Sequence, residues 1–220
     1  MLRDMTSLVA WHSMLVELHG GMLALTAFCI FAILLSRAHF NSRKTSETYG
    51  LFWVADSYVG KLAQFAEPTA YLASIGSVIG LIAAAIVGFY VYPLSFITSS
   101  PLGLSHVFLA ILATDLMIVF VFLRSRYGQG LWNNRGTAAV YAGVGFLGFL
   151  CMVLSGSLGG HLAGTGSVLD QVYAFVGINP NNFGINSSNF LGLSVGLTVI
   201  ALAVPTVIFM RFDRKAIKNR

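Results

Sequence analysis

Residues 138–166, AAVYAGVGFLGFLCMVLSGSLGGHLAGTG, decide the fold of this protein. An apolar run ends there in a glycine pair, a histidine and a small polar loop. The hydrocarbon core of a bilayer is about 30 Å thick, so a helix crosses it in roughly 20 residues. The chain contains further apolar runs of this length. Together they predict five transmembrane helices, at about 14–36, 70–92, 104–123, 138–161 and 190–210.

The composition also indicates a membrane protein. Of the 220 residues, 56% are hydrophobic and 10% are charged, whereas soluble domains carry about 25% charged residues. The apolar residues lie in long runs rather than being scattered, and no internal repeat is visible. We therefore predict an all-α, multi-pass protein of the cell membrane that forms a single domain over residues 1–220.

The basic residues are confined to particular parts of the chain. Twelve of the thirteen Lys and Arg lie in three segments, whereas 93–103 and 162–189 contain none. Lys and Arg beside transmembrane helices mark the cytoplasmic side, which predicts an N-terminus outside and a cytoplasmic C-terminus. Five crossings require this change of side. Because the net charge of +5 comes from such flanking residues, we expect no nucleic-acid partner.

The first cytoplasmic connection, 37–69, is too long and too patterned to be a simple loop. Apolar residues recur at helical spacing between Leu51 and Ala66, with polar residues on the other side. This spacing predicts a short amphipathic helix over about 50–66 that lies in the membrane surface. Pro68 then suits the first turn of the second span, where a missing amide donor has no cost.

Histidines from three predicted helices fall near one outer level of the membrane. His19 lies about five residues inside the first span, His106 near the start of the third, and His161 at the end of the fourth. Gly20 follows the first of these histidines and Gly160 precedes the last, so the backbone beside both rings is bare. A haem between helices needs two imidazoles on facing helices and a surface free of side chains. The pattern therefore predicts a bound haem b.

We expect His106 to be one axial ligand, paired with His161, His19 or His12. His12 lies two helical turns before His19 and shares its face if the first helix starts that early. The chain has no CxxCH motif, so a haem would be held without covalent bonds. One alternative is copper or another metal held by His106, His161 and His19. Another is no cofactor, with the rings hydrogen-bonded to backbone or lipid headgroups and the glycines used for packing.

Asp115 is a carboxyl group in the middle of the third span. Placing an acidic side chain there costs roughly 2.5–3.5 kcal/mol on insertion scales, so it is expected to face protein or water. One hypothesis is that Asp115 carries protons. The other is that it accepts a hydrogen bond from a hydroxyl group on a neighbouring helix.

Several short motifs of the first four spans carry a family resemblance. They are His12–Val16 at the first span, Ser105-His106 at the start of the third, Arg124 at its exit, and Ser155-Gly156 and Gly159–Leu162 at the end of the fourth. In these residues the chain resembles an uncharacterised family of four-helix prokaryotic membrane domains, a domain of unknown function suspected of binding b-type haem. That family usually has proline and a second histidine where this chain has Ser13 and Glu17. The departure leaves His12 and His19 as alternative ligands.

These observations lead to one functional expectation and two alternatives. We expect a haem-b-binding electron-transfer subunit of a membrane redox complex, rather than an enzyme by itself, and we assign no catalytic residue. Its partners would be the lipid bilayer and other membrane subunits. The first alternative is an accessory structural subunit of a larger membrane complex with no cofactor. The second is a metal-binding or transport membrane protein.

Overall fold

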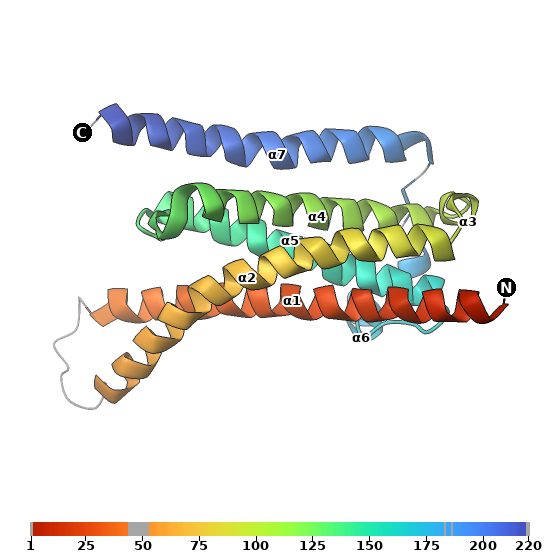
Figure 1. The fold of residues 1–220 in the computed structure, drawn as a ribbon, viewed down its shortest axis with the longest axis horizontal. Coiled ribbons are helices and arrows are strands. Elements are labelled where there is room, and N and C mark those ends of the chain that lie inside the picture. Colours follow the sequence, from red (N-terminus) through yellow and green to blue (C-terminus); the bar gives the residue numbers. More distant parts are fainter. Residues whose placement is uncertain (1, 44–52, 183, 186, 219–220) are drawn as a thin grey trace.

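A computed structural model describes residues 2–43, 53–182, 184–185 and 187–218, and these contain helices and loops but no strand. The long helices are α1 (Leu2–Arg43), α2 (Trp53–Val91), α4 (Pro101–Tyr127), α5 (Arg135–Leu162) and α7 (Ser187–Lys218). The short helices are α3 (Leu94–Thr98), η1 (Gly128–Trp132), α6 (Asp170–Phe175) and η2 (Pro180–Asn182). The expected all-α fold is confirmed for the described residues (Figure 1).

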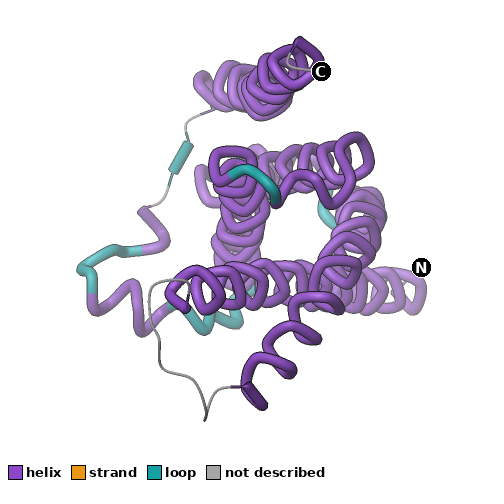
Figure 2. The backbone as a smooth tube through the Cα atoms, turned by 90° about the vertical axis from the view of Figure 1, so that its left-hand side faces the viewer, coloured by secondary structure: helices purple, strands orange, loops and turns teal. Residues whose placement is uncertain are grey.

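Four of the long helices form a ring, which Figure 2 shows end-on. Helix α1 packs on α2 and α5, and α4 packs on the same two helices. Helices α1 and α4 therefore occupy opposite corners of the ring. Helix α7 packs on α4 from outside the ring and lies apart from the other helices in both views.

The four ring helices are long and apolar enough to cross a membrane. Their apolar stretches are Ser7–Phe40, Tyr58–Val91, Pro101–Trp132 and Arg135–Leu162. In α7 the corresponding described stretch, Ser187–Ala203, is shorter. The structure thus supports a multi-pass membrane bundle. The fifth crossing, the sidedness and the cell membrane stay predictions.

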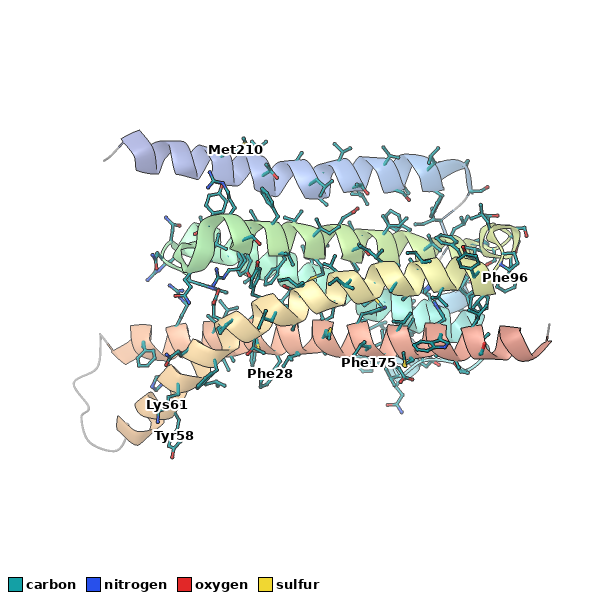
Figure 3. All side chains as sticks on the ribbon, viewed as in Figure 1. Phe28, Tyr58, Lys61, Phe96, Phe175 and Met210 are labelled. Carbon is teal, nitrogen blue, oxygen red and sulfur yellow. The ribbon has the colours of Figure 1, made fainter. Side chains whose placement is uncertain are left out.

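The outer surface of the ring suits lipid. Large apolar side chains point outward from each ring helix, and examples are Phe28 (61% exposed), Ile79 (64%), Phe122 (49%) and Leu147 (53%). Figure 3 shows Phe28 on the side of α1 that faces away from the other helices. In a bilayer such a surface needs no partner, because lipid tails are as apolar as these side chains.

The amphipathic helix expected over about 50–66 is not a separate element. From Trp53 onward it is the first part of α2, which continues into the second span without a break; residues 50–52 lie outside the described residues. Pro68 lies inside α2 rather than in a first turn. The prediction failed because the helical spacing of apolar residues continues past the proline. This part of α2 slants away from α1 and carries the exposed Tyr58 and Lys61 (Figures 1 and 3).

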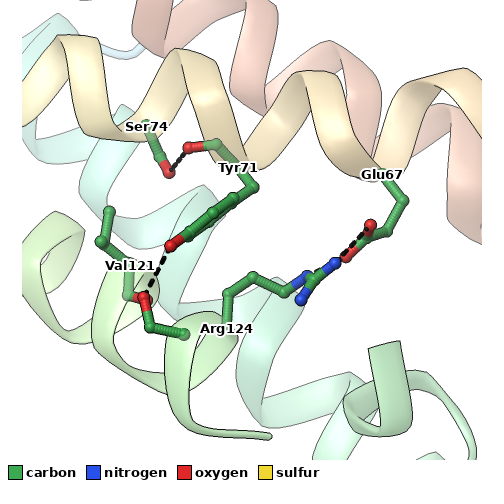
Figure 4. Close-up of polar contacts among 6 residues, drawn as sticks. Glu67, Tyr71, Ser74, Val121 and Arg124 are labelled. Atoms are coloured by element: carbon green, nitrogen blue, oxygen red, sulfur yellow. Dashed lines mark hydrogen bonds and ion pairs between the residues drawn. The ribbon is translucent and has the colours of Figure 1, made fainter. Parts of the chain in front are cut away.

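A polar cluster closes the end of the ring near η1. Arg124 of α4 forms a bidentate ion pair with Glu67 of α2. Arg124 Nη2 donates to Glu67 Oε2 at 2.8 Å, and Arg124 Nε donates to Glu67 Oε1. The Tyr71 hydroxyl lies 2.7 Å from Ser125 Oγ (Figure 4). Below this cluster the rings of Phe120 and Tyr141 stack at 4.1 Å. The cluster links α2 to α4. These helices belong to the two helical hairpins of the ring, α1 with α2 and α4 with α5.

Candidate functional site

His106 is held by α5 through its backbone. Helix α4 starts at Pro101, after Ser100, whose Oγ accepts a hydrogen bond from Gly103 N at 3.0 Å. This start places His106 in the second turn, where its Nδ1 donates to the Ser155 carbonyl at 2.8 Å. Because a carbonyl oxygen only accepts, Nδ1 carries the proton and Nε2 of the neutral ring keeps a lone pair.

A glycine of α5 makes room for the His106 ring. Gly159 lies one helical turn beyond Ser155, and a Cβ at this position would be 3.1 Å from His106 Cε1. The Ser155 hydroxyl also donates to the His106 carbonyl at 3.0 Å. The ring is therefore oriented from two sides by α5, which is how proteins fix the orientation of ligating histidines.

His12 is held in the same way, at the opposite corner of the ring of four helices. Its Nδ1 donates to the Ala84 carbonyl of α2 at 3.0 Å. A Cβ on Gly88, one turn beyond, would be 2.9 Å from His12 Cε1. Tyr92 makes an edge-on contact with the ring at 6.0 Å between centroids. His12 thus has the same proton position as His106, with Nε2 left as the acceptor.

His19 is the most buried of the described histidines, with 1% of its surface exposed. Its backbone lies close to α2, since a Cβ on Gly80 would be 2.7 Å from His19 Cβ. Among the described residues its Nδ1 has no hydrogen-bond partner. A buried ring nitrogen without a partner is costly, and such atoms are usually satisfied by water or a bound group.

His161 turns toward the loop after α5 rather than toward His106. Its Nε2 lies 2.9 Å from Asp170 Oδ1 at the start of α6. Asp170 Oδ2 in turn accepts a hydrogen bond from Ser167 N at 3.0 Å. Gly160 is packed against the same loop, because a Cβ there would be 2.2 Å from the Gly166 carbonyl oxygen. Nε2 of His161 is thus held by a carboxylate, and Nδ1 is the ring nitrogen left for a metal.

The structure holds two of the four candidate histidines in matching ways. His12 and His106 come from opposite corners of the four-helix ring, and Nδ1 of each bonds to a backbone carbonyl of the next long helix. Gly20, expected beside a cofactor, has nothing within 4 Å of an added Cβ. Among the described residues, no three or more His, Cys, Asp or Glu side chains form a metal-ion site. Two histidines that are held alike match a group with two imidazole ligands better than they match a metal held by three side chains.

Asp115 bonds to the fifth long helix. Its Oδ2 accepts a hydrogen bond from Thr198 Oγ1 of α7 at 2.5 Å. This is the contact with a hydroxyl on a neighbouring helix that the sequence suggested as one of two hypotheses. A role for Asp115 as a proton carrier stays a prediction.

The ion pair between Glu67 and Arg124 was missed in the sequence. A signal was present, since the two residues carry opposite charges at the ends of consecutive spans that the topology brings to the same level. Asp170 was also missed as the partner of His161, because the loop between them has no periodicity from which a contact follows.

Comparison with known proteins identifies no relative. No protein-family model, no curated protein and no solved structure matches this chain. Of the resemblance drawn from the sequence, the four long apolar helices of a membrane domain are supported by the fold. Membership of the family stays a prediction.

Proposed function

We propose that this protein is a haem-b-binding electron-transfer subunit of a membrane redox complex, with His106 as one axial ligand. The observation that carries the proposal is the hydrogen bond from His106 Nδ1 to the Ser155 carbonyl, which leaves Nε2 free. Histidines that bind a metal usually donate their other ring N–H to a carbonyl or carboxylate. Four-helix bundles build haem sites from side chains on facing helices.

The residues around His106 support this assignment. The Ser155 carbonyl accepts from the His106 ring, and Gly159 leaves room for it on α5. When bound, haem supplies one-electron chemistry, and its potential depends on the axial ligands and on burial. The protein's part is to hold and orient the imidazole and to keep the group non-covalently in the bundle.

The test is optical. The protein, purified from membranes of cells supplied with haem, is expected to show the α-band of a six-coordinate b haem in a reduced-minus-oxidised spectrum. His106→Ala should abolish this band, whereas His39→Ala, at the far end of α1, should leave it unchanged. Absence of the band in the wild-type protein after titration with hemin would end the proposal.

A second candidate is an accessory subunit without a cofactor, and α7 favours it. This helix lies outside the ring, and Leu191 (70% exposed), Val195 (56%) and Val199 (57%) form an apolar stripe along it. Because α7 packs chiefly on α4, most of its surface is left for lipid or for another subunit. Purification in mild detergent should then recover stable partners, and polar substitutions in the stripe should release them without changing any haem spectrum.

A further inference from the structure

The two helical hairpins of the ring place equivalent residues in equivalent contacts. In the first hairpin, α1 and α2, His12 bonds to Ala84 and rests on Gly88. In the second, α4 and α5, the corresponding residues are His106, Ser155 and Gly159. The two histidines are 94 residues apart in the sequence. Ala84 and Ser155 are 71 residues apart, and so are Gly88 and Gly159.

The same two offsets relate contacts farther along the hairpins. Thr26 Oγ1 approaches the Ala70 carbonyl at 3.5 Å. The residues 94 and 71 positions later are Phe120 and Tyr141, whose rings stack at 4.1 Å. The hairpins therefore share one packing register over several helical turns.

A methionine and a glycine also repeat, one residue out of this register. An added Cβ would lie 2.5 Å from Met22 Sδ at Gly76 and 2.8 Å from Met117 Sδ at Gly148. The methionines are 95 residues apart and the glycines 72, so each offset is one residue larger than before. Because both offsets change by the same amount, the contact between methionine and glycine is kept. The ring is thus a structural repeat of one hairpin, although the sequence shows none, because the residues in equivalent positions mostly differ.

The repeat fixes where the two histidines lie relative to each other. Helices α1 and α4 occupy opposite corners of the ring, as do α2 and α5 (Figure 2). This order corresponds to an approximate two-fold axis running along the bundle, which is the relation between parallel repeats in membrane proteins. Residues that the axis relates lie at the same depth. His12 and His106 are related in this way, on opposite sides of the axis.

We propose that His12 and His106 form a two-fold bis-imidazole site on this axis, and that both Nε2 atoms bind the iron of one haem. The inference rests on the proposed function for the identity of the ligand. Its basis in the protein is the matched pair of backbone carbonyls, at 3.0 and 2.8 Å, that put both rings in the same proton state.

The rival ligands fit this site less well. His161 bonds through Nε2 to Asp170 of the loop after α5, and the repeat relates it to Tyr90 rather than to a second histidine. His19 lies two helical turns from His12, which is about 10 Å along the axis, and its equivalent in the second hairpin is Ala113. His19 therefore lies at another depth from His106.

The test compares four substitutions in haem-loaded protein by optical and electron paramagnetic resonance spectra. His12→Gly and His106→Gly should each convert the low-spin, six-coordinate haem to a high-spin form, and added imidazole should restore the low-spin signal. Restoration also shows that each variant is folded. His19→Ala and His161→Ala should keep the wild-type signal. If His12→Gly stays low-spin while either of these loses the signal, the pairing is wrong and the haem function stands.

A second measurement separates the pairing from the haem function. In haem-free protein labelled with ¹⁵N-histidine, one equivalent of Zn²⁺ should perturb Nε2 of both His12 and His106, and His12→Gly should remove the effect on His106. If the wild-type protein takes no haem but shows this joint response, the haem function fails and the bis-imidazole site stands. If neither haem nor Zn²⁺ engages both rings, the site is overturned.

Discussion

The two hairpins differ most where the first carries a second histidine. His19 of α1 lies against Gly80 of α2, and the equivalent residues of the second hairpin are Ala113 and Cys151. In the first hairpin the larger side chain of the pair is His19, on α1. In the second hairpin it is Cys151, on α5. The first arrangement alone leaves a buried ring nitrogen without a partner among the described residues.

The two seams between the hairpins differ as well. The α2–α4 seam carries the ion pair of Glu67 and Arg124. The equivalent positions, in α5 and α1, are Ala138 and Ile30, both buried. One seam is therefore polar and the other apolar. The ring is close to two-fold at His12 and His106 but has lost that symmetry near η1.

Breaking the polar seam should have the largest effect on stability. Removing one partner of a buried ion pair costs about 3–5 kcal/mol, because the other charge is left without compensation. Glu67→Ala should thus lower the free energy of unfolding strongly, since the two side chains are only 10% and 16% exposed. Unfolding by denaturing detergent measures this loss.

The apolar seam supplies the control. Glu67→Ala combined with Arg124→Ile reproduces the residues of Ala138 and Ile30, so the double variant should recover most of the lost stability. A double variant that is as unstable as Glu67→Ala would show that the two seams are not equivalent, and it would weaken the repeat.

The glycines under the histidine rings should have the next largest effect. Gly159→Ala places a Cβ 3.1 Å from His106 Cε1, and Gly88→Ala places one 2.9 Å from His12 Cε1. Overpacking costs about 1–3 kcal/mol, and Gly88→Ala should fall in this range because its contact is the shorter one. Gly159→Ala should cost less, since the His106 ring needs to yield only slightly. Both variants should also shift the Nδ1 resonance of the affected ring. Gly156→Ala is the matched control, because nothing lies within 4 Å of its Cβ, and it should change stability by less than about 0.5 kcal/mol.

How far the sequence predicted this structure depends on the kind of feature. Apolar runs gave the ring helices, because membrane thickness constrains the length of a span. They did not separate the depth of His19 from that of His106, whereas the repeat relates His106 to His12, two helical turns from His19. The break expected before Pro68 was wrong, because α2 continues through this proline. The hairpin repeat was invisible, since it preserves contacts while the residues change, as from Ala84 to Ser155.

Replacing the second histidine should have a smaller effect. His19→Ala leaves a cavity, but it also removes the buried Nδ1 that has no partner among the described residues, so the two consequences offset each other in part. Adding Gly80→Cys should not refill the cavity, because a Cβ at position 80 would still lie 2.7 Å from the Cβ of residue 19. The double variant should therefore unfold at a lower temperature than His19→Ala. A double variant that is the more stable of the two would mean that α1 and α2 can move apart at this level, as the repeat with Ala113 and Cys151 would require.

The smallest effect is expected at Ser155, and the first hairpin explains why. His106 Nδ1 bonds to the carbonyl of this residue, not only to its side chain, and Ala84 makes the equivalent bond to His12 with no hydroxyl at all. Ser155→Ala should therefore keep the His106 proton on Nδ1. It removes the hydroxyl bond to the His106 carbonyl, which is worth about 0.5–1.5 kcal/mol. The ¹⁵N spectrum of His106 checks the proton position: movement of the proton to Nε2 would show that the hydroxyl, rather than the backbone, holds the ring, and that the two histidines are not held alike.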